Sequence, residues 1–134
     1  MKKKTFLFFF ATFWIMGLIA CKDSNSNEPN YNEPYNPNLP IVVSNIGPQV
    51  GGLGTRVVIS GSNFGNDPEK VKVYFNSKES LVLKVQNNAI YAMVPKQPGV
   101  YSTIKVAVQD GTNSDGTPKY REEILKDQQF KYNI

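Results

Sequence analysis

Short apolar runs alternate with polar positions along residues 40–134, and turn residues separate the runs. No stretch keeps a 3.6-residue hydrophobic period, whereas a two-residue alternation is typical of strands with one buried face. The pattern predicts seven strands, at 41–46, 55–61, 71–76, 80–86, 88–94, 101–109 and 124–133. Seven short strands at this spacing indicate an all-β fold, a two-layer antiparallel β-sandwich.

The alternation also predicts which face of each strand lies in the core. In one strand Val71, Val73 and Phe75 share a face, while Lys72 and Tyr74 point the other way. A sheet with one buried and one solvated face produces this pattern. By the same reasoning the later strands contribute to the core Ile90, Ala92, Val94, Ile104, Val106 and Val108.

The stretch GTRVVISGSNFG, residues 54–65, is a β-branched strand that ends in two glycines around a polar pair and an aromatic residue. We expect Phe64 to re-enter the core after the chain turns. Gly61 and Gly65 are predicted to provide backbone freedom at this corner. Asn63 is predicted to hydrogen-bond nearby backbone and so to fix the turn.

This stretch resembles the signature of IPT/TIG domains, an immunoglobulin-like (E-set) family found in plexins, some transcription factors and bacterial surface proteins. The resemblance covers residues 40–134 and implies an immunoglobulin-like β-sandwich of about seven antiparallel strands. The segment 110–123 departs from the family and is expected to be a long loop, either an insertion or a functional loop. Further matches, in family order, are Ile46-Gly47-Pro48, Val71-x-Val73-x-Phe75, Ile90-x-Ala92-x-Val94-Pro95, Ile104-x-Val106-x-Val108 and Phe130-x-Tyr132.

The N-terminus has the features of a targeting segment. Three lysines precede residues 6–20, which are uncharged and mostly apolar but fewer than the ~20 residues that a membrane-spanning helix needs. The ending Leu18-Ile19-Ala20-Cys21 resembles a bacterial lipobox. This resemblance implies that residues 1–20 are a signal peptide and that Cys21 is lipidated, which would attach the protein to a membrane. A buried cysteine after an ordinary signal or anchor helix is the alternative.

Residues 21–39 are predicted to form the lipidated cysteine and a disordered linker, because asparagine, proline and glutamate dominate and aliphatic residues are almost absent. An extended linker at ~3.1 Å per residue would hold the domain roughly 50–60 Å from the lipid. Tyr31 and Tyr35 interrupt this segment; contact with a ligand is the alternative to a simple stalk.

Charge and residue types exclude several functions. The chain carries 15 basic and 11 acidic residues; loss of three lysines with the signal peptide leaves 12 against 11, a net charge of +1. Nucleic-acid binding needs a concentrated basic surface, so we expect none. The absence of histidine excludes the usual catalytic triads and imidazole metal sites. We therefore expect no enzyme activity, metal or cofactor.

An acidic turn and the tyrosines are the remaining candidates for a site. Asp110, Asn113 and Asp115 resemble a calcium loop, but the glycine required at position 6 is missing, so a turn is the preferred interpretation. Outward-facing tyrosines serve sugar-binding surfaces as stacking faces, although cross-strand packing explains them too. The candidate ligand-binding residues are Tyr74, Tyr91, Tyr101 and Tyr120.

Two hypotheses about function result. In the first, the chain is a Bacteroidetes-like surface lipoprotein whose domain acts as a binding or spacer module, with a polysaccharide as its ligand. In the second, the domain binds an outer-membrane protein through exposed strand edges and takes no small ligand. Both place the protein on the outer membrane, at the cell surface or on the periplasmic face.

Overall fold

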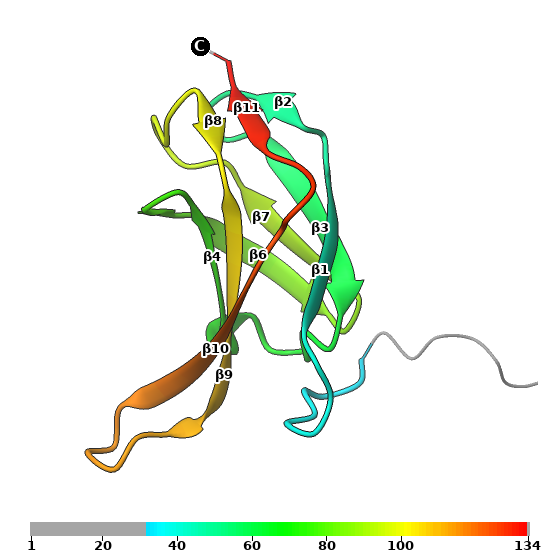
Figure 1. Cartoon of the computed structure of the whole chain (residues 1–134), viewed down its shortest axis with the longest axis vertical. Coiled ribbons are helices and arrows are strands. Elements are labelled where there is room, and N and C mark those ends of the chain that lie inside the picture. Colours follow the sequence, from blue (N-terminus) through cyan, green and yellow to red (C-terminus); the bar gives the residue numbers. More distant parts are fainter. Residues whose placement is uncertain (1–31, 134) are drawn as a thin grey trace, which may run out of the picture.

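The computed structural model describes residues 32–133, which form two four-stranded sheets and one smaller sheet (Figure 1). The first sheet has the order β1 (Val42–Gly47), β3 (Arg56–Ser62), β7 (Ala89–Met93) and β6 (Leu81–Gln86). The second has the order β10 (Pro118–Ile124), β9 (Ile104–Thr112), β4 (Val71–Phe75) and β5 (Lys78–Glu79). The third joins β2 (Val50–Gly51), β11 (Phe130–Tyr132) and β8 (Tyr101–Ser102).

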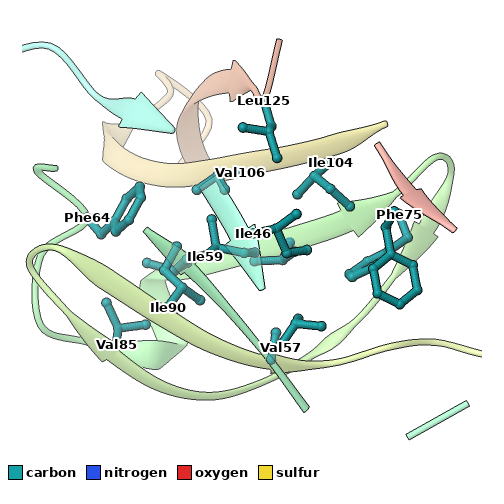
Figure 2. Packing of buried hydrophobic residues seen from close by; sticks show 14 of the residues in the cluster. Ile46, Val57, Ile59, Phe64, Phe75, Val85, Ile90, Ile104, Val106 and Leu125 are labelled. Atoms are coloured by element: carbon teal, nitrogen blue, oxygen red, sulfur yellow. The ribbon is translucent and has the colours of Figure 1, made fainter. Parts of the chain in front are cut away.

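The predicted all-β fold is confirmed, and so are the inner faces predicted for strands β4, β7 and β9. Phe75, Ile90 and Ile104 are fully buried, and their side chains lie in the core between the sheets (Figure 2). The Phe75 and Phe130 rings pack edge to face with their centroids 5.2 Å apart. Edge-to-face contact places the positive edge of one ring against the negative face of the other.

Gly61 in the 54–65 stretch is needed for a close approach rather than for backbone freedom. A Cβ at this position would collide with the carbonyl oxygen of Val42 on the neighbouring strand β1 and would lie 2.5 Å from the Phe64 ring. Gly65, in contrast, has a φ of +83°, as the sequence predicted for a residue that turns the chain. The two glycines therefore have different roles at one corner.

The segment expected to be a loop at 110–123 is instead most of a β-hairpin, and this expectation was wrong. Strand β9 continues to Thr112, and β10 pairs antiparallel with it from Pro118 to Ile124. The single strand expected at 124–133 was also wrong, because β10 ends at Ile124 and β11 begins only at Phe130. Strand β11 pairs antiparallel with β8 but parallel with β2, so the sandwich is not wholly antiparallel.

The sandwich has two distinct ends. The small sheet of β2, β8 and β11 lies at the end where the chain leaves β11, whereas residues 32–40 lie at the opposite end (Figure 1). A single 3-10 turn, η3 (Pro68–Lys70), precedes β4. Within residues 32–133 no helix is long and apolar enough to cross a membrane. The predicted signal peptide and Cys21 lie outside the described residues.

Candidate functional site

Two of the four candidate tyrosines share the outer face of one sheet. Tyr74 is on β4 and Tyr120 is on β10, with β9 between them. The ammonium nitrogen of Lys105 lies 4.8 Å from the centroid of the Tyr74 ring, and that of Lys72 lies 5.1 Å from the Tyr120 ring centroid. A cation over an aromatic face contributes about 0.5–1 kcal/mol at an exposed site. A sugar that stacked on the same ring face would have to displace the lysine.

A carboxylate completes this outer-face cluster. Lys105 Nζ lies 3.2 Å from Glu122 Oε2, and the two side chains are 35% and 53% exposed. Exposed pairs of this kind contribute little to stability, with a median of about 0–1 kcal/mol. These contacts therefore position the side chains on the outer face of the sheet, and the cluster stays accessible to solvent.

The other two candidate tyrosines lie elsewhere. Tyr91 is on β7 of the first sheet, where Lys84 Nζ lies 5.8 Å from its ring centroid. Tyr101 is on β8 of the small sheet and is 56% exposed. The four tyrosines thus lie on three different sheets and do not form one stacking platform. Their role as ligand contacts stays a prediction.

The sequence did not indicate that residues 32–39, which we call the docked segment, pack against the sandwich. Tyr35 is partly buried and packs against the hydrophobic core. Its hydroxyl oxygen accepts a 2.6 Å hydrogen bond from Arg121 Nη1, and the guanidinium carbon lies 5.8 Å from the centroid of its ring. Arg121 also donates to the Leu39 carbonyl at 3.1 Å. One arginine therefore holds both the ring and the backbone of the docked segment.

Asn63 holds the docked segment from the other side. Its φ is 64° and its side chain is almost completely buried. The amide nitrogen donates to the carbonyls of Asn36, at 2.8 Å, and Leu39, at 3.0 Å, and the amide oxygen accepts from the Asn36 N–H at 2.9 Å. We expected this side chain to fix its own turn; it binds backbone more than twenty residues away instead.

The docked segment borders two hollows. One, of about 310 Å³, lies between the docked segment, the turn that leads into η3 and the end of β9; we call it the Tyr35 groove. The other, of about 320 Å³, is lined by the same segment together with Asn63 and Asn87. Cavities of roughly this size are at the lower end of the range that binds small ligands.

The acidic side chains of the described residues lie apart or in turns. Among residues 32–133 no three acidic, cysteine or histidine side chains are grouped so that they could hold a metal ion. Asp115 accepts hydrogen bonds from the Thr117 hydroxyl at 2.6 Å and from its N–H at 3.0 Å. These bonds stabilise the charged carboxylate and lower the pKa of Asp115. They form a turn of the kind that the sequence favoured over a calcium loop.

An immunoglobulin-like sandwich with partly exposed tyrosines on its outer faces and shallow grooves fits a binding or spacer module. The model of the family described as the IPT/TIG domain matches residues 40–120, so the chain belongs to the IPT/TIG family. This match confirms the family resemblance inferred from the 54–65 stretch.

Solved structures with a similar domain come from Bacteroides. An auxiliary nutrient binding protein from Bacteroides ovatus ATCC 8483 is 32% identical with a TM-score of 0.63, over 75% of this chain and 22% of that protein. An auxiliary nutrient binding protein from Bacteroides thetaiotaomicron VPI-5482 is 30% identical with a TM-score of 0.60, over 75% of this chain and 22% of that protein.

One similar protein is an enzyme. A cyclomaltodextrin glucanotransferase from Bacillus sp. (strain 1-1) is 30% identical over 95 residues, which are 70% of this chain but only 13% of the enzyme. The chain therefore spans less than a quarter of the length of each of these three proteins. Together with the family, the names of the two Bacteroides proteins support a non-catalytic binding module.

Proposed function

We propose that this protein is a non-catalytic lipoprotein of the outer membrane whose IPT/TIG domain captures glycans at the cell surface. The observation that carries the proposal is the similarity of the domain, at 32% and 30% identity, to domains of two auxiliary nutrient binding proteins. The cyclomaltodextrin glucanotransferase makes α-glucans the first ligands to test. The lipobox-like ending at Cys21 supports the membrane attachment.

Affinity electrophoresis tests the capture of glycans. The processed chain, kept in a sugar-free detergent, is run through native gels that contain starch, xylan or mannan. We expect at least one polysaccharide to retard the protein. Tyr74→Ala and Tyr120→Ala should reduce the retardation, and Tyr91→Ala serves as the control because Tyr91 lies on the other sheet. Unretarded migration in every gel would contradict glycan capture.

Lipid attachment and location need a separate experiment. Cells that express the full chain are labelled with a palmitate analogue, and Cys21→Ser provides the unlabelled control. We expect the wild-type protein to incorporate the palmitate analogue and the Cys21→Ser variant to incorporate none. Protease treatment of intact cells should remove the domain if it faces the medium; complete protection would place it on the periplasmic side.

A protein partner is the second candidate function, and edge strand β6 favours it. This strand lies at the end of the first sheet, and its Leu81 and Leu83 are 63% and 42% exposed. A free strand edge with exposed apolar side chains is suited to pairing with another chain. Crosslinking on cells should then recover a membrane protein with the wild type but not with Leu81→Lys. Equal recovery with both would exclude β6 as the contact.

A further inference from the structure

The Tyr35 groove is a hollow with fixed walls. At its floor, Gly65 has a φ of +83°, and a Cβ there would lie 3.1 Å from the Cβ of Tyr35. The docked segment forms an adjacent wall, whose Pro34, Tyr35 and Pro37 present apolar surface to the hollow. Because Arg121 fixes this wall through its hydrogen bond to Tyr35, the groove is formed before any ligand arrives.

Two charged groups line this groove without a partner within residues 32–133. Asp110 is partly buried near the end of β9, and its carboxylate makes no hydrogen bond or ion pair there. Lys70, at the end of η3, also makes no ion pair, so these opposite charges line one hollow more than 4.0 Å apart. Asp67 differs, because its carboxylate already accepts a 2.9 Å hydrogen bond from the Glu69 N–H.

This arrangement suits hydroxyl groups. A hydroxyl both donates and accepts, so neighbouring hydroxyls of one molecule can donate to a carboxylate and accept from an ammonium group. A neutral hydroxyl-bearing ligand meets like-charge repulsion from none of the charged groups that line the groove, Asp67, Asp110 and Lys70. The prolines and Tyr35 offer apolar surface to the carbon-bound hydrogens of a sugar ring. A volume of about 310 Å³ accommodates roughly one or two such rings.

One residue that lines the groove, Gln109, also belongs to the tyrosine face. Gln109 lines the groove and lies directly opposite Tyr120 in the pairing of β9 with β10. Directly opposed residues of an antiparallel pair project to the same side of the sheet. Asp110 is the next residue of β9 and projects to the other side, the side on which Arg121 holds the docked segment. Asp110 and Tyr120 therefore lie on opposite faces of the sheet.

We propose that the Tyr35 groove is the primary carbohydrate subsite of this domain, in which Asp110 and Lys70 bind the hydroxyls of a neutral sugar. This inference rests on the proposed capture of glycans. It makes the docked segment, a part of the chain that precedes the matched family domain, one wall of the site.

Nuclear magnetic resonance tests the groove. The processed chain, labelled with ¹⁵N and held in sugar-free detergent micelles, is titrated with maltoheptaose, xylohexaose and mannohexaose. We expect amide shifts to concentrate at residues 64–67 and 108–111. Asp110→Asn and Lys70→Ala should each weaken binding by about tenfold, as loss of a hydrogen bond to a charged group predicts.

Matched controls remove the same charges elsewhere. Asp127→Asn and Lys126→Ala change exposed residues that line a different hollow, between β1 and the end of β10, and should leave the affinity unchanged. Two results would contradict sugar binding in the Tyr35 groove while leaving glycan capture intact. The first is amide shifts confined to Tyr74, Tyr91 or Tyr101, and the second is equal affinity in Asp110→Asn and Asp127→Asn. Absence of binding by all three oligosaccharides would overturn both proposals.

Discussion

Asn63 provides the sharpest test of how the docked segment is held. Its buried amide makes three hydrogen bonds, two with Asn36 and one with Leu39. A typical intramolecular hydrogen bond contributes about 1 kcal/mol net, and removing one partner leaves the other unsatisfied. We therefore expect Asn63→Ala to lower the free energy of unfolding by about 3 kcal/mol. In a domain of this size that corresponds to a fall in Tm of roughly 12–24 °C.

A second variant separates the hydrogen bonds from the backbone. The φ of Asn63 is 64°, which glycine adopts readily and alanine does not. Asn63→Gly loses the same three hydrogen bonds, but we expect it to be about 1 kcal/mol more stable than Asn63→Ala. Asn66→Ala is the control, because the exposed Asn66 amide makes one bond to the docked segment, at 2.8 Å to the Asn32 carbonyl.

Denaturant unfolding followed by circular dichroism measures all four proteins. The expected order of stability is wild type, Asn66→Ala, Asn63→Gly and Asn63→Ala. The reasoning is refuted if Asn63→Ala stays within 1 kcal/mol of the wild type, or if Asn63→Gly unfolds at the wild-type midpoint. Either result would mean that the docked segment adds nothing to the stability of the domain.

Three further predictions concern the sandwich itself. Gly61→Ala should destabilise the domain by more than about 3 kcal/mol, whereas Gly47→Ala, whose Cβ would meet nothing within 4 Å, should cost less than about 1 kcal/mol in denaturant unfolding. Phe130→Ala should cost about 3–5 kcal/mol in the same assay, because its ring is completely buried. The pKa of Asp115 is below its unfolded value, so its contribution to stability is present above the unfolded pKa and is lost as the pH falls through the folded one. Thr117→Val should raise that pKa in an NMR titration, and an unchanged pKa would contradict the hydrogen bonds.

The sequence revealed strands that bury one face and missed strands that bury neither, such as β5 and β10. In β4 the alternation of Val71, Val73 and Phe75 with polar residues reports directly on burial. In β10 none of the seven residues from Pro118 to Ile124 is fully buried, so no two-residue hydrophobic period exists to be detected. Strand β10 is held by its pairing with β9. That pairing consists of backbone hydrogen bonds, which any residue type except proline can make, so the sequence does not reveal it.

Less of the candidate site than of the fold could be predicted from the sequence. The alternation correctly placed Tyr74 on an outer face, but which tyrosines share a sheet depends on strand order, which composition does not determine. The contact of Tyr35 with Arg121 joins residues 86 positions apart. One lies in a proline-rich segment and the other in an expected loop, and neither carries a hydrophobic pattern that predicts burial.

The docked segment changes the geometry of the proposed membrane attachment. With lipid on Cys21, as proposed above, residues 22–31 are all that separate the lipid from the first docked residue, Asn32. Ten residues span at most about 35 Å even when fully extended, well short of the 50–60 Å expected for a free linker up to residue 39. The Tyr35 groove, which the docked segment borders, then belongs to the end of the sandwich nearer the lipid, and the small sheet with Tyr101 to the far end. Asn63→Ala, by releasing the segment, should therefore both weaken sugar binding and let the domain move farther from the membrane, whereas a site on the tyrosine face alone would change only the distance.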